Sequence, residues 1–139
     1  MTDMTIGKVA DVVGVGVETI RFYERRKLIE QPPRPREGGY RIYSDATVRR
    51  LHFIRRAQEL GFSLREIAEL LALRDAESNQ ADASDVRQRA MAKLHDVDQK
   101  IEQLRRIRQG LAALVDCCPG QGPLQCCSIF DALEQNAGP

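Results

Sequence analysis

All four cysteines of the 139-residue chain lie close together near its C-terminal end, as two adjacent pairs. Cys117-Cys118 and Cys126-Cys127 are separated by a segment that contains two prolines and two glycines. These residues exclude a helix between the pairs and favour a tight loop that folds back on itself. Thiolates that such a loop brings together bind soft metal ions, or they oxidise. The sequence therefore predicts a metal-binding or redox-active site at these four positions.

The composition is that of a folded protein with one locally basic stretch. The chain is 42% hydrophobic and 29% charged, it has no apolar run near the roughly 20 residues of a membrane span, and it lacks the apolar core of a secretory signal. We therefore expect a soluble, cytoplasmic protein without a membrane partner, where clustered cysteines serve as ligands or redox groups. Residues 21–56 hold eleven Arg or Lys against four Asp or Glu, although the net charge is only +1. Such a stretch is typical of a phosphate-binding surface, and equally of a solvated helical face.

Two short helices are predicted at the start of the chain. Thr5 and a helical apolar pattern indicate a helix over 6–13, and the glycines at 14 and 16 end it. A second helix follows over 17–26. We expect it to bury Val17, Ile20 and Phe22 and to leave Thr19, Arg21, Tyr23 and Arg25 available to a partner. Two short helices joined by a glycine turn favour a helix-turn-helix, whose second helix would enter the major groove of DNA.

Residues 31–43 predict a small β-hairpin, or wing. The proline-rich segment 31–36 cannot be helical, residues 37–39 form a turn, and residues 40–43 alternate like a short strand. Arginines then lie at the tip, and Tyr40, Arg41 and Arg34 or Arg36 could reach a DNA backbone. Of Tyr40 and Tyr43, we expect one to pack on the helices and the other to be partly free.

Two more helices complete the first part of the chain. Ser44, with Asp45 in the first turn, begins a third helix, which Gly61 ends. Ser63 and Glu66 form a capping-box pattern for a fourth helix that ends near residue 73. The expected apolar faces are Val48, Leu51, Ile54 and Leu60 on the third helix, and Leu64, Ile67, Leu70 and Leu71 on the fourth.

A long helix is predicted over 85–115, after a polar loop at 74–84. Its apolar residues recur in alternating steps of three and four, which is typical of a coiled-coil seam. The helix is too long to bury this seam against a head of about 70 residues, so a second copy of the chain is the expected partner. Ser128 could then cap a last short helix over 129–134. The seam positions are Ala90, Leu94, Val97, Ile101, Leu104, Ile107 or Arg108, Leu111 and Leu114.

Four segments of this chain resemble the MerR family of metal-responsive transcription regulators. They are Glu18–Glu24, Gly39–Tyr43, Phe53–Arg55 and Leu60–Leu64. The resemblance covers nearly the whole chain. It implies a mainly α fold with a winged helix-turn-helix DNA-binding head at 1–73 and a linker at 74–84. The implied fold continues with a long antiparallel coiled-coil dimerisation helix at 85–116. It ends with a metal-binding loop and a short C-terminal helix at 117–139.

The family resemblance also implies a function, which is not enzymatic. A homodimer binds promoter DNA, and metal binding shifts the dimer so that the DNA is distorted and RNA polymerase engages both promoter elements. Arg21 is the first choice for a base contact, since a guanidinium pairs bidentately with guanine. Arg34, Arg36, Arg55 and Arg56 would serve phosphates or solvate the surface. The residues that the resemblance assigns to DNA are Thr19, Arg21, Tyr23, Tyr40 and Arg41.

The inducing metal stays open between two branches of the family. The spacing from Cys118 to Cys126 resembles sensors of Cu(I), Ag(I) or Au(I), whereas Cys117-Cys118 with Cys127 resembles sensors of Hg, Cd, Zn or Pb. Sensors of divalent ions normally add a cysteine from the partner's long helix, and Ala83 or Ser84 stands there in this chain. Four loop thiolates can compensate, which favours a divalent thiophilic ion.

Three other functions compete with metal sensing. A redox sensor would hold a cross-loop disulfide or an iron–sulfur cluster, although the two adjacent pairs differ from the cluster-binding spacing known in the family. A thiol enzyme needs a catalytic base, and no His, Asp or Glu lies between the cysteine pairs. A multidrug-type regulator needs a separate ligand domain, for which the chain has no room.

Overall fold

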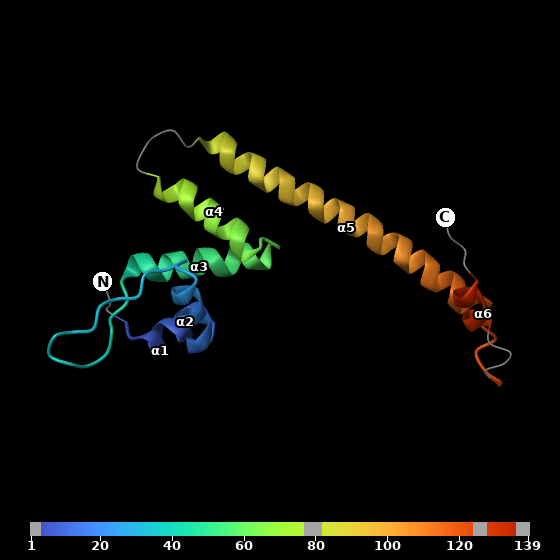
Figure 1. Ribbon diagram of the computed structural model, residues 1–139, viewed down its shortest axis with the longest axis horizontal. Helices are drawn as coiled ribbons and strands as arrows, with labels where there is room; N and C mark the ends of the chain where they lie inside the picture. The colour runs from blue at the N-terminus through green and yellow to red at the C-terminus, as the bar shows by residue number, and fades with distance from the viewer. Residues whose placement is uncertain (1–3, 77–81, 124–127, 136–139) are drawn as a thin grey trace. The chain divides into compact units, whose positions relative to one another are not determined.

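A computed structural model describes residues 4–76, 82–123 and 128–135 and is mainly helical (Figure 1). The chain divides into two compact units, Met1–Val86 and Arg87–Pro139, which we describe separately. Its helices are α1 (Ile6–Val13), α2 (Val17–Arg25), α3 (Asp45–Glu59), α4 (Leu64–Asp75), α5 (Ala83–Cys117) and α6 (Ser128–Glu134). The predicted order of elements is confirmed for the helices.

One hydrophobic core holds the first unit together. It forms where α1 packs against α2 and α3, and α3 packs against α4. Ile20, Leu51, Ile54 and Ile67 are fully buried in it. Each such side chain stabilises the fold by about 1.5–3 kcal/mol relative to an exposed one. The helical spacing predicted for these four positions is therefore confirmed.

The turn between α1 and α2 depends on Gly14 and Arg55. Gly14 has φ +83°, a left-handed conformation that ends α1. Arg55 of α3 reaches this end, and its Nη1 donates to the carbonyl oxygen of Val13 at 2.6 Å. A cation at a helix C-terminus also offsets the negative end of the helix dipole. Arg55 thus fixes α1 onto α3, a role that the sequence did not indicate.

The starts of α3 and α4 are capped as predicted. The Ser44 side chain accepts a hydrogen bond from the backbone N–H of Thr47 at 3.2 Å. Ser63 and Glu66 form the reciprocal capping box, with bonds of 2.8 and 3.1 Å. These four residues set where the two helices begin.

The ends of α3 and α4 differ from the expectation. Leu60 is 69% exposed rather than part of the apolar face, because α3 ends at Glu59 and Leu60 already lies in the turn at Gly61. Helix α4 continues to Asp75, whose carboxylate pairs with Arg50 at 2.8 Å. Arg50 also donates from Nε to the Leu28 carbonyl oxygen, so it ties the end of α4 to the segment after α2.

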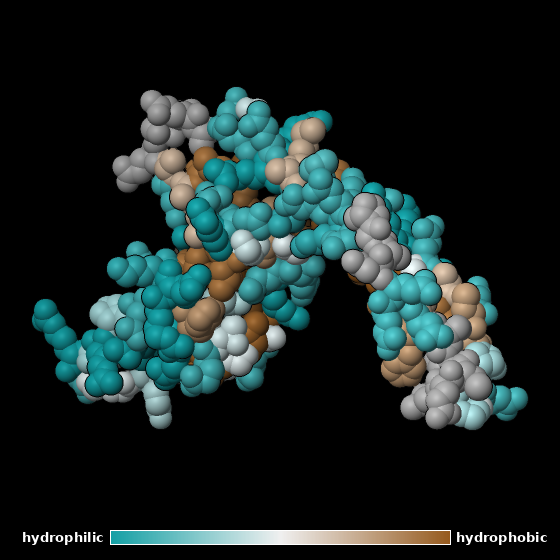
Figure 2. Space-filling model, turned by 45° about the vertical axis from the view of Figure 1, so that its right-hand side comes forward, coloured by the Kyte–Doolittle hydropathy of each residue, from teal (hydrophilic) through white to brown (hydrophobic). Residues whose placement is uncertain are grey.

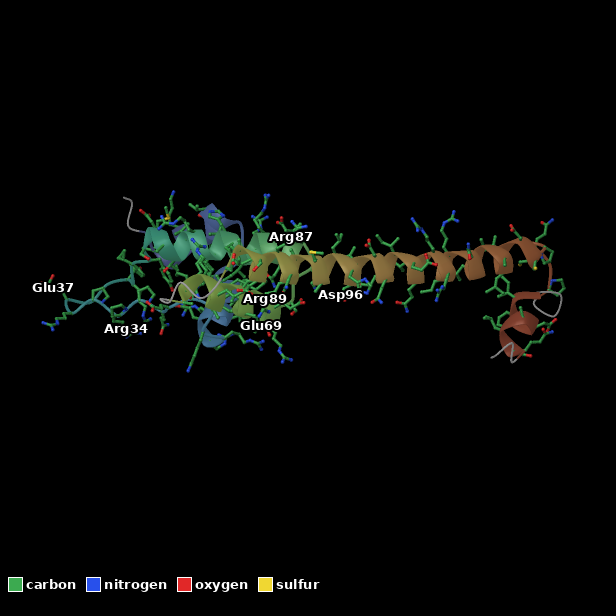
Figure 3. All side chains as sticks on the ribbon, turned by 90° about the horizontal axis from the view of Figure 1, so that it is seen from above. Arg34, Glu37, Glu69, Arg87, Arg89 and Asp96 are labelled. Carbon is green, nitrogen blue, oxygen red and sulfur yellow. The ribbon has the colours of Figure 1, made fainter. Side chains whose placement is uncertain are left out.

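The predicted β-hairpin at 31–43 is wrong. The described residues contain no β-strand, and their only isolated bridge joins Met4 to Tyr43. Three prolines, at 32, 33 and 35, have no N–H to donate to a second strand, and the Tyr43 N–H donates to the Met4 carbonyl oxygen instead. The segment is an open loop that projects from the helices, with Arg34 and Glu37 on its outer part (Figures 1 and 3). We call residues 31–43 the projecting loop.

Helix α5 dominates the second unit. It has 35 residues, begins and ends two residues beyond the predicted 85–115, and spans about 50 Å at roughly 1.5 Å per residue. None of its residues, all of which the structure describes, is buried. The apolar seam is exposed, as at Leu94 (61%), Leu104 (63%) and Leu111 (57%), and Figure 2 shows hydrophobic surface open to solvent on this unit. No described helix combines the length and apolar character needed to cross a membrane.

Replacing Gly14 with Ala should lower the free energy of unfolding by about 1–3 kcal/mol. The left-handed backbone penalises any Cβ, and the added carbon would lie 2.7 Å from Arg55 Nη1, so the guanidinium must leave its bond to Val13. Urea unfolding at fixed protein concentration, followed by circular dichroism, measures the change. Gly7→Ala is the matched control, because its Cβ meets nothing within 4 Å and lies inside α1, where Ala is favoured. Equal effects of the two substitutions would contradict this account of the turn.

Candidate functional site

The outward face of α2 differs from the predicted one at two neighbouring residues. Tyr23 is 4% exposed and belongs to the core, and its hydroxyl donates to Gln58 Oε1 at 2.6 Å. Phe22 is 37% exposed instead, with the Arg26 guanidinium 5.6 Å from its ring centroid. Tyrosine can be buried when its hydroxyl finds a partner, and Tyr23 follows Ile20 by three positions, on the same helical face. That spacing was the signal for burying Tyr23; nothing in the sequence pointed to Gln58.

The base of the projecting loop is anchored on α2 through Tyr43. Tyr43 is 2% exposed, and its hydroxyl donates to Glu24 Oε2 at 3.0 Å. Burial raises the pKa of Tyr43 to about 12, the bond to Glu24 and its negative charge add to the rise, and the charges of Arg21 and Arg41 oppose it. The hydroxyl therefore keeps its proton and its bond at neutral pH. The predicted division between the two loop tyrosines is confirmed, since Tyr40 is 79% exposed.

A basic cleft lies where α2 meets the projecting loop. Its volume is about 340 Å³. Arg21 comes from the helix, and Arg34, Tyr40 and Arg41 come from the loop. We call this the arginine cleft. Its complete lining is Ile6, Arg21, Gln31, Arg34, Gly39, Tyr40, Arg41 and Tyr43.

The chemistry of the arginine cleft suits a phosphate group. Guanidinium groups offer planar, charged donors that match phosphate oxygens. The Nε of Arg41 is buried and has no hydrogen-bond partner within the described part of the chain. A buried unpaired donor costs free energy that a bound anion would recover by reorienting or pairing the guanidinium. Three arginines from two segments therefore give this cleft the charge and the donors to attract a phosphate group.

The structure brings together three of the five residues that the sequence assigned to DNA. Arg21, Tyr40 and Arg41 line the arginine cleft. Thr19 is half-buried on α2, outside the cleft lining. Tyr23 is enclosed in the core, so the expectation that its side chain is available to a partner is wrong.

The thiol pair at the end of α5 is described only in part. Cys117 is the last residue of α5 and is exposed, and Cys118 is half-buried with its N–H donating to the Val115 carbonyl oxygen at 3.2 Å. Gly120 and Gly122 have φ of 82° and 109°, so the chain turns sharply after the pair, as predicted. Cys126 and Cys127 lie outside the described residues, and with them the predicted four-thiolate site. Within the described ranges, which include Cys117 and Cys118, no group of three or more His, Cys, Asp or Glu could hold a metal ion.

Known proteins match this chain along almost its full length. Residues 4–73 match the family described as MerR HTH family regulatory protein, and residues 48–114 match the one described as MerR, DNA binding. The mercuric resistance operon regulatory protein of Bacillus cereus is 46% identical over 128 residues, which are 92% of this chain and 95% of that protein.

Two solved structures share the fold. The transcription regulator PbrR691 from Ralstonia metallidurans CH34, in complex with lead(II), has a TM-score of 0.81 at 32% identity and covers 94% of this chain and 98% of its own. The dual function transcriptional regulator MerR from Bacillus megaterium MB1, in complex with mercury(II), has a TM-score of 0.70 at 42% identity and the same two coverages.

Replacing Tyr43 with Phe should destabilise the protein by about 1 kcal/mol at neutral pH, because it removes the hydrogen bond to Glu24. The pKa of Tyr43 is raised from 10.0 to about 12 in the folded state. A raised pKa contributes stability that is complete below pH 10 and is lost as the pH rises toward 12. The difference between the two proteins should therefore shrink over that range. Urea unfolding of both at matched concentrations measures it, and a constant difference would contradict the Tyr43–Glu24 bond.

Proposed function

The chain belongs to the MerR family of helix-turn-helix regulators, and from this we propose that it is a metal-responsive transcription regulator, not an enzyme. It acts in the cytoplasm as a homodimer on promoter DNA. The observation that carries the proposal is the position of Cys117, which ends the same helix that exposes the apolar seam. A metal ion held by this residue acts directly on the dimerisation helix.

DNA binding is assigned to α2 and the projecting loop. Helix α2 enters the major groove, where Thr19 and Arg21 reach base edges. Tyr40 and Arg41 hold the DNA backbone together with Arg34, and all three residues line the arginine cleft from the projecting loop. Tyr23 contributes from the core by fixing the helix through Gln58. Contacts to phosphates position the dimer, and contacts to bases specify the sequence.

Dimerisation is assigned to the seam of α5. A helix of 35 residues without a buried side chain gains little from tertiary packing on its own. Leu94, Ile101, Leu104 and Leu111 are exposed along it at coiled-coil spacing. A second copy supplies a complementary face for this seam, in antiparallel orientation as in the family.

The inducer is a divalent thiophilic ion bound by Cys117, Cys118, Cys126 and Cys127. Four thiols without an intervening carboxylate or imidazole form a soft donor set. The related regulators solved with lead(II) and mercury(II) support a divalent ion of this class. We take mercury(II) as the first candidate, because the Bacillus cereus relative is named for mercuric resistance. The bound ion supplies a cross-link between the two ends of the loop.

Metal binding changes the promoter by preferring one of two dimer conformations. The loop shifts the end of α5, the dimer distorts the DNA, and RNA polymerase then engages both promoter elements. In this scheme, a change in the cysteine loop can abolish the response to metal while DNA binding persists. Substitutions in the two regions should therefore separate the two activities.

Arg21→Ala should weaken operator binding by about 2 kcal/mol or more in the dimer, because each protomer loses a bidentate base contact. Fluorescence anisotropy with a labelled operator at fixed ionic strength measures the affinity. Arg105→Ala is the matched control, since it removes the same charge from an exposed position on α5. Dimerisation and metal uptake should be unchanged in both variants. Unchanged operator affinity in Arg21→Ala would mean that α2 does not contact DNA in the proposed way.

Cys118→Ser should abolish metal-induced transcription without loss of operator binding. Removing one thiolate weakens the soft donor set but leaves α2 and the projecting loop intact. Ala113→Ser, near the end of α5, is the control that adds a hydroxyl and keeps all four thiols. Induction that persists in Cys118→Ser would mean that the loop is not the sensor.

The metal itself is tested by competition between Cu(I), Zn(II), Cd(II), Pb(II) and Hg(II) on reduced protein under anaerobic conditions. X-ray absorption then counts the sulfur ligands. We expect a divalent ion with three or four sulfur ligands. Exclusive retention of Cu(I) by two sulfurs would assign the protein to the monovalent sensors instead.

A further inference from the structure

We propose that Phe22 is a specificity-determining residue that reads thymine, through contact of its ring with the C5-methyl group in the major groove. The inference rests on the proposed function, since it requires α2 to be the recognition helix. The inference requires that the operator contains an A·T base pair opposite α2, with its thymine methyl group facing Phe22.

The position of Phe22 on the helix places it between two residues assigned to bases. An α-helix turns by roughly 100° per residue. Phe22 therefore lies about 100° from Arg21 on one side and about 60° from Thr19 on the other. The arc between Thr19 and Arg21 that contains Phe22 faces away from the core, because Ile20 and Tyr23 occupy the buried arc. If Thr19 and Arg21 both reach the groove, Phe22 must face it as well.

Phe22 is not needed to complete the core of the first unit. Ile20 is fully buried and Tyr23 is 4% exposed, whereas 37% of Phe22 is open to solvent. Its ring therefore offers apolar surface on the outward side of α2, where a partner can contact it. The surrounding residues Glu18, Arg21, Arg25 and Arg26 are all exposed.

The ring of Phe22 is held in place from two sides. The Arg26 guanidinium lies over it, 5.6 Å from the centroid. The Tyr23 ring lies beside it, with centroids 6.0 Å apart and an angle of 54° between the planes. Tyr23 is itself buried and bonded to Gln58, so one of the two neighbours of the ring is an anchored side chain. A preordered apolar group loses little conformational entropy when it binds.

The chemistry of the major groove leaves one target for such a group. A phenyl ring donates and accepts no conventional hydrogen bond, so it cannot read the polar edges of guanine, cytosine or adenine. The C5-methyl of thymine is the apolar feature of the groove, and phenylalanine is one of the residues that contact it. Arg21 would read guanine and Phe22 would read thymine on the same face.

The test replaces thymine by uracil, which removes only the methyl group. A duplex is first selected from a random pool with the full-length wild-type protein, and each thymine is then replaced singly. Loss of one buried methyl corresponds to about a four-fold loss of affinity. We expect such a loss at one thymine in each half-site, and the two sensitive positions should be related by the symmetry of the duplex. Phe22→Ala should bind more weakly and should no longer distinguish thymine from uracil there.

Two further proteins make the result decisive. Phe22→Gln keeps a side chain of similar reach without the apolar ring, so it should also lose the discrimination. Val12→Ala removes apolar surface from an exposed position on α1, 43% exposed, and should keep it. Circular dichroism spectra and unfolding of all variants confirm that α2 is intact.

The outcomes separate this inference from the proposed function. A wild-type protein that selects no duplex would refute the regulator itself. A wild-type protein that binds its duplex but tolerates uracil at every position would overturn the role of Phe22, whatever the variants do. The same would follow if Phe22→Ala kept the full uracil penalty, because another side chain would then contact the methyl.

Discussion

The hydrogen bond from Tyr43 to Glu24 joins the projecting loop to α2, and the arginine cleft depends on that bond. Arg21 and Arg41 lie on opposite sides of the junction, in the helix and in the loop. Like charges repel, so a cleft lined by three arginines needs other interactions to bring its walls together. The buried ring of Tyr43, its bond to Glu24 and the backbone bond to Met4 provide them. The resulting surface gathers the positive charge of two segments in one cleft.

Much of the first unit followed from local sequence rules, and its errors have identifiable physical causes. Ser44, Ser63 and Glu66 cap helices as their spacing predicts, because capping is decided within one helical turn. The exchange between Phe22 and Tyr23 could not be foreseen from hydrophobicity alone, since Gln58, 35 positions away, satisfies the Tyr23 hydroxyl. The predicted β-hairpin is wrong because the prolines of the loop have no N–H groups with which to form ladder hydrogen bonds to residues 40–43. Arg55 was assigned to phosphates or solvent, but a long-range contact with Val13 gives it a structural role.

The candidate sites were predictable to different degrees. Arg21, Tyr40 and Arg41 were identified from the family resemblance, and the structure gathers them with Arg34 in a single cleft. The proposed thiol site was visible in the sequence as a set of four soft donors, because clustered cysteines that do not form disulfides usually serve as ligands or redox groups. The coordination number does not follow from the sequence, since the number of thiolates that bind one ion depends on how closely the two cysteine pairs approach each other. Donor chemistry limits the choice to soft ions, and the proposed competition among metals distinguishes between them.

Because the apolar seam of α5 is exposed in the single chain, the stability of the proposed dimer depends on the protein concentration. In the proposed dimer, a long helix that buries nothing within its own chain would gain most of its packing free energy from the second copy. By mass action, a protein stabilised by association unfolds more readily as it is diluted. In the proposed dimer, a cell with few copies would hold fewer ordered α5 helices, and fewer thiol loops anchored at Cys117. The threshold of the metal response would then shift with gene dosage, even with every ligand unchanged.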